Sequence, residues 1–132
     1  MPVVEFQPTT YSEVMELFPE SKSSELIFSP STELYLIVDA ESRDTVGMCG
    51  FRWGATTVTF KNAYIHPQWR NRGYNKVALD KRIEMARERG MRYIDGNLTE
   101  PSAREWAKRG AEVRKQYKNG IVLGRIYLGD TL

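Results

Sequence analysis

Hydrophobic and polar residues change their spacing several times along the chain, and each spacing predicts one kind of element. Apolar and polar residues alternate in Thr57-Val58-Thr59-Phe60-Lys61, a pattern typical of a half-buried strand. The run Leu34-Tyr35-Leu36-Ile37-Val38 is continuously apolar and predicts a strand buried on both faces. On these grounds we predict strands at 3–6, 33–38, 45–53, 57–65, 91–95, 113–117 and 121–128.

Apolar residues spaced by three or four positions predict helices between these strands. The longest covers 75–89, where Leu79, Ile83 and Ala86 share one face and Gly90 gives a C-terminal stop. A second helix is predicted over 9–18, and a third follows Thr99, with proline in its first turn. Residues 21–30 predict a shorter helix or an irregular loop.

The connections between the strands predict a mixed sheet. Asn119-Gly120 lies between the last two strands and is a strong signal for a hairpin, and the polar turn 39–44 predicts another. The strand–helix–strand segment from 57 to 95 predicts a parallel crossover. We therefore expect one α/β (α+β) domain over 1–132, with the order β-α-(α)-β-β-β-α-β-α-β-β.

Composition excludes several classes of protein. The chain of 132 residues has one cysteine, Cys49, and one histidine, His66, which excludes an internal disulfide scaffold and the usual structural zinc sites. We predict no metal. The start of the chain lacks a secretory signal, and no apolar run approaches the roughly 18 residues of a membrane span. We expect a soluble, cytoplasmic protein that has no membrane partner.

The charge is concentrated in one segment. The net charge is +2, but residues 70–92 contain eight basic and three acidic residues, a local excess of +5. This excess favours a phosphate-bearing ligand, although a solvated helix face with paired charges would give the same count. Nucleic acid is not the expected partner, because aromatic residues are not interleaved with the positive charges.

The segment Arg70-Asn71-Arg72-Gly73-Tyr74-Asn75 lies between a predicted strand and the longest helix. A glycine at this place lets the free N–H groups of the first helical turn face an anion, and the helix dipole favours the negative charge. The spacings of the dinucleotide-binding and P-loop motifs are both absent. A phosphate-bearing ligand would thus be bound through a different motif.

This segment resembles the acetyl-CoA motif Q/R-x-x-G-x-G/A of the GCN5-related N-acetyltransferases (GNAT). Ile65-His66-Pro67 precedes it, as a V-x-P-like strand end does in the family. Residues 106–111 look like the family's aromatic-x-x-x-G-F signature, and the element order matches over about 3–128. The resemblance implies a GNAT-like fold: a mixed, mostly antiparallel central sheet with a parallel crossover and helices on both faces.

The resemblance also implies a function, the direct transfer of an acetyl group from acetyl-CoA to an amine, with acetyl-CoA as co-substrate. The strand at Tyr64 and Ile65 would offer a backbone N–H to the thioester carbonyl. Asn97 would replace the asparagine that often begins the second signature. The residues implied to bind CoA are Ile65, Arg70, Asn71, Arg72, Gly73, Tyr74, Asn75 and Lys76.

Some residues depart from the family pattern. Asn75 stands where the motif has glycine or alanine, Trp106 aligns with the tyrosine that protonates the thiolate, and residues 57–61 contain no glutamate to act as a base. These departures favour an alternative, a catalytically inactive GNAT-like binding or structural module such as a phage virion component. In a chain this short, an acceptor pocket must come from short loops or from a second subunit, as in a homodimer.

Overall fold

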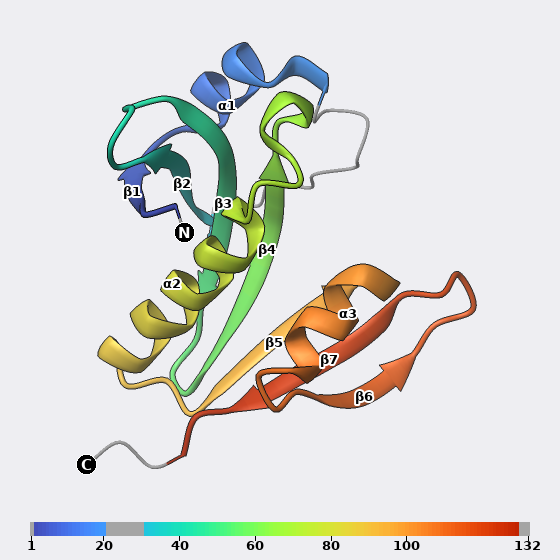
Figure 1. Ribbon diagram of the computed structural model, residues 1–132. Helices are drawn as coiled ribbons and strands as arrows, with labels where there is room; N and C mark the ends of the chain where they lie inside the picture. The colour runs from blue at the N-terminus through green and yellow to red at the C-terminus, as the bar shows by residue number, and fades with distance from the viewer. Residues whose placement is uncertain (1, 21–30, 130–132) are drawn as a thin grey trace.

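The structure, a computed structural model, describes residues 2–20 and 31–129 (Figure 1). The predicted helix or loop at 21–30 lies outside the described residues. The described elements are β1 (Val4–Pro8), α1 (Tyr11–Leu17), β2 (Glu33–Asp39), β3 (Thr45–Trp53), β4 (Thr57–Ile65), the 3-10 helix η2 (Pro67–Trp69), α2 (Tyr74–Glu88), β5 (Tyr93–Leu98), α3 (Glu100–Ala107), β6 (Glu112–Gln116) and β7 (Val122–Tyr127).

The seven strands form one sheet in the order β1-β2-β3-β4-β5-β7-β6. β4 and β5 pair in parallel, and all other neighbouring strands pair antiparallel. This confirms the predicted mixed, mostly antiparallel sheet with one parallel crossover. The predicted hairpin around Asn119-Gly120 joins β6 to β7, and Gly120 has the positive φ of 83° that such a turn requires.

The helices cover both faces of the sheet, as predicted. α1 packs its Val14 against the face formed by Leu34, Leu36, Val38 and Met48. α2 and α3 cover the other face, where the larger core contains Ile37, Phe51, Phe60, Ile94 and Trp106. The alternation along β2 explains why this strand is apolar throughout: its successive side chains fill two different cores. In the described part of the chain, no helix is both long and apolar enough to cross a bilayer.

The bounds of two strands differ from the prediction by two residues or more. The first strand, predicted at 3–6, extends to Pro8, and the fifth, predicted at 91–95, extends from Tyr93 to Leu98. β7 pairs with β5 as far as Leu98 and so prolongs it. The missing side chain of Gly96 leaves room for the Trp106 ring, because a Cβ here would lie 2.6 Å from Trp106 Cη2.

The parallel strands β4 and β5 separate soon after they pair. Their ladder covers Thr57–Thr59 of β4 and Tyr93–Asp95 of β5, and beyond it the two strands diverge (Figure 1). The register between β3 and β4 shifts between Gly50, which faces Lys61, and Met48, which faces Tyr64. This extra residue on β4 is a bulge, which bends the strand away from its neighbour. The opening between α2 and α3 results from this divergence.

Candidate active site

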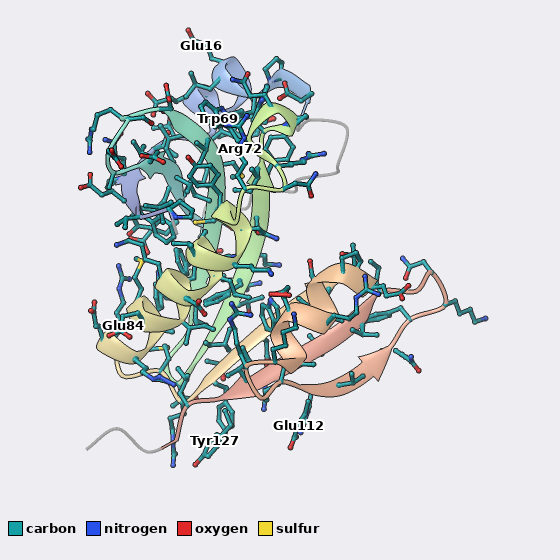
Figure 2. All side chains as sticks on the ribbon, viewed as in Figure 1. Glu16, Trp69, Arg72, Glu84, Glu112 and Tyr127 are labelled. Atoms are coloured by element: carbon teal, nitrogen blue, oxygen red, sulfur yellow. The ribbon has the colours of Figure 1, made fainter. Side chains whose placement is uncertain are left out.

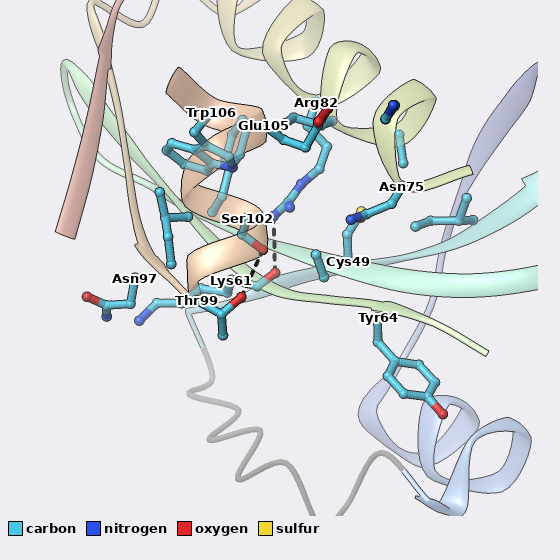
Figure 3. A pocket seen from close by; sticks show the side chains of 17 residues that line it. Cys49, Lys61, Tyr64, Asn75, Arg82, Asn97, Thr99, Ser102, Glu105 and Trp106 are labelled. Atoms are coloured by element: carbon cyan, nitrogen blue, oxygen red, sulfur yellow. Dashed lines mark hydrogen bonds between the residues drawn. The ribbon is translucent and has the colours of Figure 1, made fainter. Parts of the chain in front are cut away.

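Two adjoining cavities occupy the space where β4 and β5 diverge. One has a volume of about 590 Å³ and lies beside the loop from β4 to α2; we name it the loop cavity. The other, of about 390 Å³, lies beside the bulge of β4 and is named the bulge cavity (Figure 3). The two cavities share lining residues from β4, α2 and α3, so they lie side by side. These shared residues are Ala63, Tyr64, Asn75, Lys76, Ser102 and Glu105.

The loop before α2 presents free backbone N–H groups to the loop cavity. Gly73 caps the helix in the left-handed region, with φ 87°, and the first bond within the helix runs from Val77 N–H to Gly73 O. The N–H groups of residues 74–76 precede that bond and have no acceptor within the helix. The first turn contains no acidic side chain. This is the arrangement that binds a phosphate at a helix N-terminus.

The edge of β4 orients Ile65 toward the cavity. His66 N–H donates to Val46 O of the neighbouring strand at 2.8 Å. Because backbone groups alternate in direction along an antiparallel ladder, the N–H of Ile65 points to the opposite edge, where β5 has diverged. The carbonyl of Ile65 on the same edge accepts a bond from Arg70 Nε at 2.8 Å. Ile65 therefore offers its N–H to the space between the strands.

The side chain of Tyr64 lies on the other face of the sheet. It packs with the α1 core, and its hydroxyl donates to Glu20 Oε1 at 2.8 Å. Burial and the nearby Glu20 carboxylate raise the pKa of Tyr64 to about 12. Figure 3 shows its ring directed toward α1 and away from Arg82. The phenol thus stays protonated near neutral pH, and the Arg70 guanidinium lies over the Tyr64 ring, 5.5 Å from its centroid.

The remaining residues of the predicted anion loop differ in their positions. Arg70 and Asn71 line the loop cavity, whereas the Arg72 guanidinium stacks over the Trp69 ring, 5.1 Å from its centroid (Figure 2). Tyr74 is buried, and its hydroxyl donates to Asp39 Oδ2 at 2.5 Å. The Tyr74 hydroxyl is therefore engaged by Asp39, which does not line the loop cavity.

Helix α3 forms a wall of the site that the sequence did not predict. Pro101, Arg104, Glu105 and Lys108 line the loop cavity opposite the start of α2. Their spacing of three and four residues places them on one face of the helix, which the sequence could have shown. The sequence alone could not show that this face lies opposite α2 across an opening. Two basic side chains therefore join Arg70 and Lys76 around the cavity. The carboxylate of Glu105 pairs with Lys108 at 2.9 Å, which lowers its pKa.

The end of β5 contributes the predicted Asn97. Its exposed side chain lines the bulge cavity beside Thr99, whose hydroxyl donates to Ser102 Oγ at 3.3 Å (Figure 3). Trp106, also at this cavity, is only 5% exposed and packs edge-on against Phe60. The structure thus brings Asn97 of β5 to the same cavity as Asn75 and Lys76 of α2.

The one histidine and the one cysteine of the chain have structural surroundings. His66 Nδ1 accepts a bond from Gln68 N–H at 3.3 Å, and its Nε2 lies 3.3 Å from Glu20 Oε1. Cys49 is fully buried in β3, and burial raises the pKa of its thiol to about 11. A thiol with this pKa stays protonated near neutral pH and is a weak nucleophile.

Comparison with known families decides the assignment. The model of the Acetyltransferase (GNAT) family matches residues 4–111, which include the loop before α2 and the whole of α3. The chain belongs to the GNAT acetyltransferase family. No curated protein matches it significantly.

Solved structures share the GNAT fold at low sequence identity. A GNAT family acetyltransferase from Elizabethkingia anophelis with acetyl-CoA bound is 16% identical, with a TM-score of 0.66 over 95% of this chain and 98% of that one. A Bacillus subtilis acetyltransferase in complex with CoA is 17% identical, with a TM-score of 0.72 over 98% and 100%. The spermidine/spermine N-acetyltransferase SpeG from Vibrio cholerae, in mutant forms, is 8% identical, with a TM-score of 0.74 over 94% and 93%.

Proposed function

We propose that this GNAT protein is an acyl-CoA-dependent N-acyltransferase that moves an acetyl group from acetyl-CoA to an amine. The observation that carries the proposal is the helix N-terminus at Gly73, which lines the first of two adjoining cavities between two diverging strands. An anion site joined to a long cavity is what a ligand with a pyrophosphate and an extended thioester arm requires.

The residues around the cavity fit such a ligand. The free N–H groups of residues 74–76 would hold the pyrophosphate, aided by Arg70 and the side chain of Lys76. Asn75 replaces the smaller residue of the family motif, and its exposed side chain reaches both cavities. Its amide can donate a bond to a phosphate oxygen.

The chemistry requires the amine to attack the thioester directly. The amine nitrogen forms a bond to the carbonyl carbon, the carbon–sulfur bond breaks, and the proton released by the amine balances the departing thiolate. Ile65 would donate its N–H to the carbonyl oxygen, where negative charge develops. Asn97 would orient the reacting groups from the end of β5. Much of the rate enhancement would then come from proximity and from this hydrogen bond.

The alternative function is a GNAT-like binding or structural module without catalysis, such as a virion component of a phage. The observation in its favour is Trp106, which is 5% exposed and stands where many family members have a proton-donating tyrosine. Glu105, a carboxylate of the cavity, has a lowered pKa because Lys108 pairs with it, which makes it a weak base. Location in the cytoplasm and pairing into a homodimer stay predictions.

Calorimetric titration of CoA and acetyl-CoA into the protein tests the binding step, and release of free CoA thiol with a panel of amines tests turnover. We expect binding and turnover in the native chain and loss of both in Gly73→Trp. The matched control is Gly110→Trp, since Gly110 has nearly the same φ of 86° with no atom near its missing Cβ. Binding without turnover would favour the inactive module, and no binding at millimolar CoA would overturn the proposal.

A further inference from the structure

Arg82 is a buried charged side chain that lines the bulge cavity. It is only 4% exposed and lies on α2 among buried neighbours that include Cys49 and Phe60. Its Nη2 donates to Gly50 O at 2.7 Å and to Lys61 O at 3.1 Å, which are the residues of β3 and β4 at the bulge. Figure 3 shows it reaching from α2 to Lys61. The guanidinium is thereby held in one position.

The charge of Arg82 lacks a counterion within the described part of the chain. Its Nε is buried without any hydrogen-bond partner, and its two bonds from Nη2 both go to neutral carbonyls. The Phe60 ring, 4.2 Å from the guanidinium carbon, contributes only a cation–π contact. A buried cation without an anionic partner is costly, and apolar residues of similar volume are generally tolerated better in a core. An anion bound in the cavity would remove this cost.

The cavity provides room for such an anion beyond the reacting thioester. It extends from Asn97 and Thr99 at the end of β5 to Cys49 and Arg82, a space of about 390 Å³. Its lining is mixed: Ile37, Leu79 and Leu98 are apolar, whereas Asn97, Thr99 and Glu105 are polar or charged. An acetyl group ends in a methyl and offers nothing that a guanidinium can bind. An acyl chain with apolar methylenes and a terminal carboxylate matches the apolar part of this lining and the buried guanidinium.

We propose that Arg82 binds the terminal carboxylate of a dicarboxylic acyl group, so that the chain prefers acyl-CoA donors of the malonyl or succinyl class over uncharged donors of equal length. This inference rests on the proposed function. The transfer itself is unchanged: the amine nitrogen bonds to the thioester carbon, CoA thiol leaves, and the distal carboxylate stays bound to Arg82 throughout. Arg82 is thus a specificity residue for the acyl donor.

Titration calorimetry with succinyl-CoA and butyryl-CoA tests the proposal, because these two donors have the same number of acyl carbons and differ in the terminal carboxylate. We expect the native chain to bind succinyl-CoA at least tenfold more tightly than butyryl-CoA. In Arg82→Met this preference should fall to about one, while the affinity for free CoA stays unchanged. Lys61→Met is the matched control, since it removes another cation that lines the same cavity and keeps the carbonyl that Arg82 binds.

The outcomes separate this inference from the proposed function. Tight binding of CoA with equal affinity for the two donors overturns the inference alone, and so does a preference that disappears in Lys61→Met but persists in Arg82→Met. Failure of every CoA compound to bind overturns both. If Arg82→Met does not fold, Arg82→Lys replaces it. Lysine keeps the charge but lacks the planar guanidinium, so the preference for succinyl-CoA should fall severalfold. An unchanged preference contradicts the proposal.

Discussion

Two neighbouring residues at the start of α2, Gly73 and Tyr74, have different roles. Gly73 supplies a backbone conformation that exposes free N–H groups, whereas its neighbour Tyr74 fixes the helix to the turn after β2. The Tyr74 hydroxyl donates to Asp39, which also accepts bonds from Glu41 N–H and Ser42 N–H at 2.8 Å each. The hydrogen bond from Tyr74, followed by that from Ser42, lowers the pKa of Asp39. Reciprocally, the bond to Asp39 raises the pKa of Tyr74 to about 12.

The Tyr74–Asp39 bond predicts a pH-dependent stability difference for Tyr74→Phe. Asp39 has a lowered pKa, so its contribution is present above its ordinary pKa near 4 and is lost as the pH falls through the folded value. Tyr74 has a raised pKa, so its contribution is present below about pH 10 and is lost between about 10 and 12. We expect Tyr74→Phe to melt at a lower temperature than the native chain between these limits and to converge with it at both extremes.

Thermal melts followed by circular dichroism across this pH range measure the difference. Tyr127→Phe is the control, because Tyr127 is 59% exposed and its ring lies beside Tyr93 on the sheet (Figure 2). A deficit in Tyr74→Phe that is equal at all pH values would show that the Asp39 bond is not its source.

At the scale of elements, α3 is held to the sheet by one aromatic side chain over two glycines. Trp106 covers Gly96 of β5, and it lies near Gly124 of β7. The absence of both side chains lets α3 approach the sheet, and this approach places its basic residues opposite α2. Trp106 therefore positions α3 through its contacts in the core.

This packing predicts unequal effects for two similar substitutions. In Gly96→Ala the new Cβ would lie 2.6 Å from the Trp106 ring, which is rigid and fixed by Phe60. In Gly124→Ala the nearest atom, at 2.7 Å, is the Leu98 Cδ1 methyl, which can rotate away. We expect Gly96→Ala to reduce the free energy of unfolding by about 1–3 kcal/mol, as overpacked cores do, and Gly124→Ala by less. Urea unfolding of both variants checks the order, and the reverse order would contradict this account of the α3 contact.

At the scale of the whole molecule, the positive charge around the cavity differs from the charge count of the sequence. Of the eight basic residues in 70–92, only Arg70, Lys76 and Arg82 line the cavities. Others bind elsewhere, as Arg89 does with Glu33 at 3.2 Å. Lys61 of β4, Arg104 of α3 and Lys108 at the end of α3 add basic side chains from outside that segment. The positive charge around the cavities is thus assembled by the fold from distant parts of the chain.

Neutralising the α3 charges should weaken CoA binding. We expect Arg104→Gln/Lys108→Gln to bind CoA roughly 2- to 30-fold less tightly, from about 0.2–1 kcal/mol for each exposed charge pair, with a smaller dependence on salt. Titration calorimetry at two salt concentrations measures both effects. Arg87→Gln/Arg114→Gln is the control, because it removes the same charge at exposed positions away from the cavity. Equal losses in the two variants would show that only net charge matters.

The sequence by itself determined most of the elements, the mixed sheet and the glycine that precedes α2. These follow from local rules: period two for strands, period near four for helices, Asn-Gly for a hairpin, and glycine before a helix. The C-terminal end of β5 could not be predicted from the sequence, because pairing with β7, a distant segment, prolongs the strand.

Only the tertiary structure decided how the site is composed. The sequence named Tyr64 and Ile65 together, but the ladder with β3 directs the Ile65 N–H to the opening and the Tyr64 ring to α1. In the sequence, Arg82 is one of eight basic residues in a segment, whereas folding buries it in the lining of a cavity. The direction of a backbone N–H, the burial of a side chain and the position of one helix opposite another arise from contacts between residues far apart in the chain. No local sequence pattern encodes them.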